Sequence, residues 1–137
     1  MHGLTILNPR NVRTEQANGG DSAQAQLAIG PYEQDALVLV SASGSSAYVG
    51  PGANAGLILA IRVDDEEVAS DDTFEGESFN MTYRSAASHT FVLRCGQHST
   101  VEARVDKHGA GNTTNSSVRL RCYALALAPG HHDADLV

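Results

Sequence analysis

Histidines and a cysteine gather in the stretch HTFVLRCGQH, residues 89–98. Cys95 and His98 are separated by two residues, a spacing that two ligands of a zinc ion can have. A zinc site, however, needs three or four ligands that converge on the ion. Cys95 is in phase with Phe91 and Leu93, so we expect it to point into the core, whereas His98 belongs to a surface turn. The pattern therefore favours a β-strand and its turn over a metal site, and we expect no cofactor.

Two further groups of possible ligands lie elsewhere in the chain. His131 and His132 are adjacent, so on an extended chain they point in opposite directions and chelate poorly. We expect them in a solvated tail or in one that docks on a neighbouring subunit, and we include both in the candidate partner interface. The segment 64–77 holds eight of the sixteen acidic residues, but its spacing does not match a D-x-D-x-D-G calcium loop. A solvated hairpin edge is favoured there, with calcium or a basic partner left open.

Motifs for catalysis and phosphate binding are missing from the chain. The glycine-rich segment 50–56, GPGANAG, lacks the Lys and Ser/Thr of a P-loop and precedes an expected strand, so no helix terminus can hold a phosphate. The serines of SASGSS are not set in a G-x-S-x-G elbow. We therefore expect a protein that is not an enzyme.

Size and charge narrow the class of protein. A length of 137 residues favours one domain, and a formal net charge of −7 disfavours nucleic-acid binding. The first apolar run, LTIL, is too short for a signal peptide, and no stretch reaches the ~18 apolar residues of a membrane span, so we expect a cytoplasmic origin. For the two cysteines, free thiols are the expectation and a disulfide is the alternative.

Alternating apolar and polar residues predict strands throughout the middle of the chain. Segment 56–70 is typical of a hairpin that turns at Asp64 and Asp65, and segment 89–106 of a second hairpin that turns at Gly96–Ser99. The last strong strand spans 117–128. The remaining strand candidates are 25–29, 36–42, 46–49 and 78–84, with Gly/Ser/Asn-rich turns between them.

This succession predicts an all-β fold of about eight short strands, a jelly-roll-like antiparallel β-sandwich, with an immunoglobulin-like sandwich as the alternative. We expect an N-terminal arm over 1–24, the sandwich over 25–128 and a C-terminal tail over 129–137.

Arginines and a tyrosine are expected to form a face on the outside of the sandwich. The residues concerned, on strands expected to be near neighbours, are Arg94, Arg104, Arg119, Arg121 and Tyr123. Because Arg and Tyr are enriched at protein interfaces, this face is a candidate partner surface. The alternative is a solvated face whose arginines pair with Glu102.

The segments GLILAIRVDDEEVAS, HTFVLRCGQHSTVEARVD and VRLRCYALALA resemble the strand–turn succession of small viral jelly rolls. In layout the chain resembles bacteriophage cement (capsid decoration) proteins. That resemblance implies a virion protein, assembled in the host cytoplasm, which binds the capsid exterior as a homodimer or homotrimer and bridges major capsid or other shell proteins. No nucleic acid or membrane partner is implied. The same segments are also similar to receptor-binding jelly rolls of tail fibres and to lectins, so carbohydrate or receptor binding is the alternative.

Overall fold

The computed structural model is all-β. It describes residues 5–6, 13–49, 51–53, 55–74, 77–79, 81–108 and 112–127. Within these ranges every regular element is a strand, and none of them is a helix of the length and hydropathy needed to cross a membrane.

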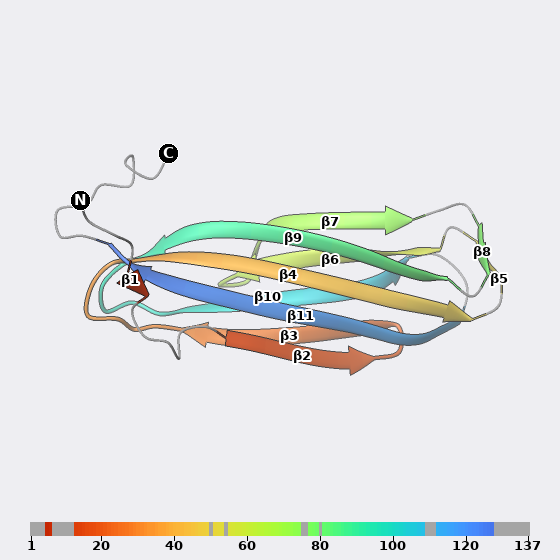
Figure 1. The fold of residues 1–137 in the computed structure, drawn as a ribbon, viewed down its shortest axis with the longest axis horizontal. Coiled ribbons are helices and arrows are strands. Elements are labelled where there is room, and N and C mark those ends of the chain that lie inside the picture. The colour runs from red at the N-terminus through yellow and green to blue at the C-terminus, as the bar shows by residue number, and fades with distance from the viewer. Residues whose placement is uncertain are drawn as a thin grey trace.

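Two antiparallel sheets stack face to face (Figure 1). Sheet A contains β1 (Thr5–Ile6), β2 (Arg13–Gly19), β4 (Ala36–Val49), β9 (Thr82–Leu93) and β11 (Asn112–Ala126). Sheet B contains β3 (Ser22–Ile29), β6 (Gly56–Val63), β7 (Glu66–Phe74) and β10 (Ser99–His108). A short pair, β5 (Pro51–Ala53) and β8 (Glu77–Phe79), lies at one end of the sandwich.

The strand order is that of a jelly roll. Sheet A runs β2-β11-β4-β9 and sheet B runs β3-β10-β6-β7, while β1 pairs with the end of β11. Strands that follow each other along the chain mostly alternate between the two sheets, which is the double Greek-key connectivity of this fold. The predicted jelly-roll-like sandwich is therefore confirmed.

The core lies between the sheets and is built from alternate residues of the long strands. Sheet B supplies Leu57, Leu59, Ile61, Val101 and Val105, all fully buried. Sheet A contributes Val38, Val40, Val118, Leu120 and Cys122, which are also buried. Each buried Val, Leu or Ile contributes about 1.5–3 kcal/mol, and the alternation that buries them leaves the intervening side chains on the outer faces.

Gly44 lies where β4 packs closely against sheet B. A Cβ built on it would lie 2.1 Å from Val105 Cγ2, so a side chain there has no room. Next to it the buried Ser46 hydroxyl hydrogen-bonds Ser116 at 2.9 Å. The predicted break of this segment into strands 36–42 and 46–49 was therefore wrong: the small residues of SASGSS continue one 14-residue strand, because they permit close packing of the sheets.

One predicted hairpin is present and the other is not. β6 and β7 pair antiparallel around Asp64 and Asp65, whose φ angles of 51° and 68° form a tight turn. β9 and β10 do not pair with each other, since β9 pairs with β4 and β10 with β3 and β6. Residues 94–98 carry the chain from sheet A to sheet B instead of reversing it within one sheet. Within this connection the Gly96 amide donates a hydrogen bond to the Tyr32 carbonyl.

The sandwich also begins earlier than the expected boundary at residue 25. Residues 13–19, placed in an N-terminal arm by their polar sequence, form β2 along β11. Segment 78–84 divides between β8 and β9. The expected tail 129–137 lies outside the described residues.

Candidate functional site

The outer face of sheet A presents its side chains in rows across β9, β4 and β11. Five successive rows are Arg84–Ser45–Ser117, Ala86–Ser43–Arg119, Ser88–Ser41–Arg121, Thr90–Leu39–Tyr123 and Val92–Leu37–Leu125. Successive rows lie two residues apart along each strand, or about 7 Å. Three rows therefore carry an arginine, and the two that follow carry mostly apolar side chains.

This face is positively charged in an acidic protein. On the outward positions of these three strands, as far as the structure describes their side chains, there are three arginines and no Asp or Glu. Arg84 and Arg121 make no ion pair with any residue that the structure describes. Sheet B differs, because its outward positions carry the acidic residues Glu67, Asp72, Glu102 and Asp106 together with Arg62 and Arg104, so acidic side chains outnumber the arginines there. A chain of net charge −7 thus concentrates positive charge on one face.

Two adjoining depressions hollow the arginine-bearing rows. Their volumes are about 580 Å³ and 440 Å³, and both are lined by Ser43, Ala86 and Arg119, so they form one continuous trough. We define the trough by its floor of small residues, Ser41, Ser43, Ser45, Ala86 and Ser88, and by its rim, Arg84, Arg119 and Arg121. The trough exists because the outward side chains of β4 are small at Ser41, Ser43 and Ser45, between two strands that carry arginines.

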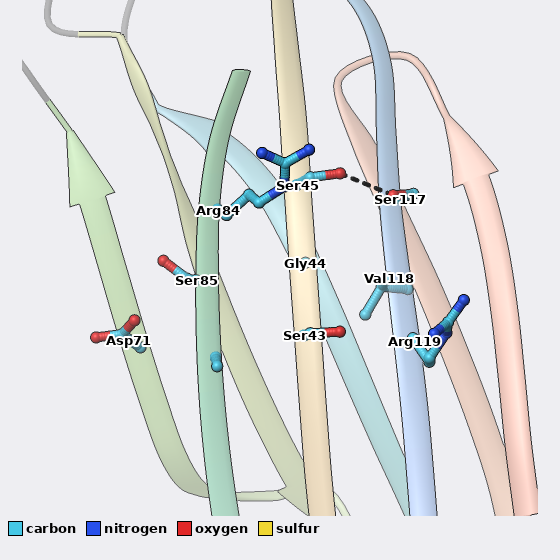
Figure 2. A pocket seen from close by; sticks show the side chains of 10 residues that line it. Ser43, Gly44, Ser45, Asp71, Arg84, Ser85, Ser117, Val118 and Arg119 are labelled. Atoms are coloured by element: carbon cyan, nitrogen blue, oxygen red, sulfur yellow. Dashed lines mark hydrogen bonds between the residues drawn. The ribbon is translucent and has the colours of Figure 1, made fainter.

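The larger half of the trough is shown in Figure 2. Arg84 extends from β9 toward Ser45 on β4, and Arg119 projects from β11. The hydroxyls of Ser45 and Ser117 hydrogen-bond each other at 2.8 Å. Asp71 reaches the lining from the neighbouring edge strand β7 and is its acidic member.

The apolar end of the same face follows the trough. It comprises Leu37, Leu39, Val92, Tyr123 and Leu125, which are half-buried except for Leu39, 37% exposed. Tyr is enriched at protein contacts together with Arg, and here Tyr123 lies between apolar side chains and the arginine-bearing rows.

The structure brings together three of the five predicted face residues and separates the other two. Arg119, Arg121 and Tyr123 share the outer face of β11. Arg104 projects from the outer face of sheet B, on the opposite side of the sandwich. Arg94 lies in the connection after β9, where its Nη1 contacts Asp35 Oδ2 at 3.1 Å. The expectation that these strands are neighbours was wrong for Arg104, because β10 belongs to sheet B and β11 to sheet A. His131 and His132 lie outside the described residues.

The Arg104 side chain pairs with a carboxylate of its own strand, β10. Its Nε donates hydrogen bonds of 3.1 Å and 3.0 Å to the two carboxylate oxygens of Asp106. The hydrogen bond and the charge of Asp106 raise the pKa of the Arg104 guanidinium against a smaller opposing effect of burial. The ion pairs expected on a solvated face are thus found on sheet B, with Asp106 in place of the expected Glu102.

The two cysteines are free thiols in different surroundings. Cys122 is buried as predicted, and desolvation raises the pKa of its thiol to about 12. Cys95 is exposed, not buried, because β9 ends at Leu93 and the alternation stops there. Its amide donates to Asp35 Oδ1 at 2.8 Å.

The possible metal ligands are scattered. Cys95 and His98 are exposed in the same connection, whereas His89 stacks on Phe91 with ring centroids 6.1 Å apart. Among the described residues no three His, Cys, Asp or Glu side chains gather closely enough to hold an ion.

The acidic segment forms the exposed edge of sheet B as far as the structure describes it. Residues 64–67 and 70–72 are exposed, and β7 is the edge strand. Asp64 is engaged in the fold, since its Oδ1 accepts the Thr100 amide at 2.9 Å and its Oδ2 accepts the Ser99 hydroxyl at 2.8 Å. The solvated hairpin edge is therefore confirmed for these residues.

Arg84 and Leu39 were missed as members of the face. The sequence did indicate that Arg84 points outward, since the residues at alternate positions along this strand, Arg84, Ala86, Ser88 and Thr90, are exposed. Only the pairing of β9 with β4 places them beside the arginines of β11.

No protein-family model and no curated protein matches this chain. Solved structures are similar at a distance. Dimeric latent PorU from Porphyromonas gingivalis is 8% identical over 85% of this chain and 13% of its own, with a TM-score of 0.48. The EclA C-terminal domain, described as a sugar-binding protein, is 10% identical over 81% of this chain and 77% of its own, with a TM-score of 0.39. A chain of infectious bursal disease virus, Gx strain, is 11% identical over 87% of this chain and 37% of its own, with a TM-score of 0.35.

This chain spans between 13% and 59% of the length of the first three similar structures. Similarities at this level give no function for it.

Proposed function

We propose that this chain is a non-enzymatic structural protein of a virion, a decoration protein that binds the outside of a capsid shell and bridges its subunits. The observation that supports the proposal is the outer face of sheet A. This face joins a cationic trough to an apolar end in a protein whose net charge is −7. Such a face suits a partner protein that offers carboxylates next to apolar side chains.

In this proposal the chain acts as a homodimer or homotrimer. Ion pairs at exposed arginines are individually weak, so stable binding to a shell requires several troughs to engage at once. A symmetric oligomer presents one trough per subunit to a repeating lattice, which converts weak contacts into high avidity. Native mass spectrometry reads the oligomeric state directly, and a monomer would contradict this part of the proposal.

Co-sedimentation tests the proposed function. Shells assembled from the major capsid protein of the same genome are mixed with the chain and centrifuged. The wild-type chain should pellet with the shells, and the double variant Arg119→Glu/Arg121→Glu should lose at least tenfold in apparent affinity. Arg104→Glu, a reversal on the opposite sheet, is the matched control and should bind like the wild type. A wild-type chain that stays in the supernatant contradicts the proposal, and equal losses in both variants contradict the placement of the interface.

A second candidate function is carbohydrate or receptor binding. The observation that favours it is the row of hydroxyls on the trough floor, where Ser41, Ser43 and Ser88 are exposed beside arginines. Such a floor could hydrogen-bond the hydroxyls and the acidic group of a sugar. A panel of neutral and acidic glycans tests this function. Binding by the wild-type chain that is lost in the Arg119→Glu/Arg121→Glu variant supports it, and no binding to any glycan of the panel contradicts it.

A further inference from the structure

The face carries an ordered sequence of side chains along the strand direction. Arg84, Arg119 and Arg121 occupy three successive rows, and Leu39 with Tyr123 occupies the next. Leu37 with Leu125 follows. Three cationic rows are therefore followed by two apolar rows, and with about 7 Å between rows the series extends over about 27 Å.

An extended polypeptide has the same period. Its side chains i and i+2 point to one side and lie about 7 Å apart, so each alternate residue meets one row. A helix fits less well. With side chains it is about 10–12 Å across, whereas the strands that bear the arginines, β9 and β11, flank β4 and so lie only about 10 Å apart.

We propose that the trough and the apolar end bind an extended segment of a partner protein that carries carboxylates at three alternate positions and apolar side chains at the next two. The inference rests on the proposed function to the extent that the partner is a protein. The exposed hydroxyls of Ser41, Ser43 and Ser88 supply hydrogen bonds to the backbone of such a segment.

The same face argues against a uniform polyanion. Nucleic acids and sulfated glycans have no apolar side chains to cover Leu39 and Tyr123. The carboxylate of Asp71, which lines the larger half of the trough, repels a polyanion that fills its full length. A protein segment avoids the first cost, because it can place apolar residues at one end, and its three spaced carboxylates meet less repulsion from Asp71 than a polyanion with charge along its whole length.

Two peptides of equal composition test the period. The first, Ac-ESESESLSL-NH2, places its acids and leucines at alternate positions. The second, Ac-EEESSSSLL-NH2, has the same residues without the alternation. Fluorescence anisotropy with dye-labelled peptides at low salt should show at least tenfold tighter binding of the alternating peptide. The preference should decrease as salt screens the ion pairs.

Variants of the chain locate the binding. Arg84→Glu/Arg121→Glu should abolish binding of the alternating peptide, and Arg104→Glu should leave it unchanged. Asp71→Asn removes the carboxylate from the lining and should tighten binding about two- to fivefold. A variant that loses its far-UV circular dichroism is excluded, and the Asp71→Asn arm, which predicts a gain, remains informative in that case.

Three results would overturn the inference. Equal binding of the two peptides would show that the face does not recognise the two-residue spacing of the side chains. An equal loss in Arg104→Glu places the peptide elsewhere. Tighter binding of a heparin fragment than of the alternating peptide, at equal charge, assigns the trough to an anionic glycan. Failure of the shell experiment with a retained peptide preference contradicts the virion role alone, whereas shell binding without a peptide preference contradicts this inference alone.

Discussion

Replacing Gly44 by alanine tests how closely the two sheets pack beneath the trough. The new Cβ would lie 2.1 Å from Val105 Cγ2, and an ordinary contact of 3.4 Å requires more than 1 Å of movement. Val105 is fully buried and β-branched, so it cannot rotate away freely. Overpacking of this kind costs about 1–3 kcal/mol, and removing glycine's backbone entropy returns about 0.5–1 kcal/mol. A Cβ that would lie 2.1 Å from a buried side chain belongs to the upper part of the overpacking range, about 2–3 kcal/mol, so Gly44→Ala should lower the free energy of unfolding by about 1–2.5 kcal/mol.

The cause can be isolated with a double-mutant cycle. Val105→Ala alone removes two buried methyl groups and should cost about 2 kcal/mol. In the double variant the alanine Cβ at position 44 occupies space that Val105 has vacated, so the combined loss should fall short of the sum by about 1 kcal/mol or more. Urea unfolding followed by far-UV circular dichroism measures all four proteins, since the chain has no Trp for fluorescence.

Gly20→Ala is the matched control. No heavy atom lies within 4 Å of a Cβ at that position, so the change should stay within about 0.5 kcal/mol. If Gly44→Ala proves as neutral as Gly20→Ala, or if the cycle shows no coupling to Val105, then the close approach of the sheets at β4 is refuted.

Two substitutions, a thiol titration and a pH series have definite expected outcomes. Asp65→Gly should raise the thermal midpoint by a few degrees, because Asp65 has a φ of 68° that glycine adopts without steric cost. Asp64→Ala should lower the free energy of unfolding by about 1–3 kcal/mol in urea, since it removes the acceptor of the Thr100 amide. The native chain should react with one equivalent of a thiol reagent at Cys95 and with two in urea, because burial raises the pKa of Cys122 to about 12. For the same reason stability should fall as pH rises above 9, where the unfolded thiol ionises and the native one stays protonated, by up to about 1.4 kcal/mol per pH unit from this group.

Where apolar and polar residues alternate along a strand, the sequence alone predicts which side chains point into the core and which lie on the outer face. Leu57, Leu59 and Ile61 are buried as their spacing indicates, and Arg119 and Arg121 point outward. The hairpin at Asp64 was also predictable, because its pairing is local and its turn is short. A two-residue periodicity fixes which way a side chain points, but not which sheet its strand joins.

The pairing of distant strands could not be predicted in this way. Segment 89–106 has the pattern of a hairpin, yet residues 94–98 cross between the sheets and leave β9 beside β4. That single difference separates Arg104 from the candidate face and adds Arg84 to it. The serines of SASGSS were also misleading, because turns and closely packed central strands both favour small residues.

Hydroxyl-radical footprinting of the chain on assembled shells tests most directly whether the outer face of sheet A is the docking surface. Leu39 on that face is 37% exposed and Ile58 on the outer face of sheet B is 40% exposed, so the two aliphatic side chains are matched probes. Shell binding should slow the oxidation of Leu39 severalfold and leave that of Ile58 unchanged. Protection of Ile58 with Leu39 still reactive would contradict the account.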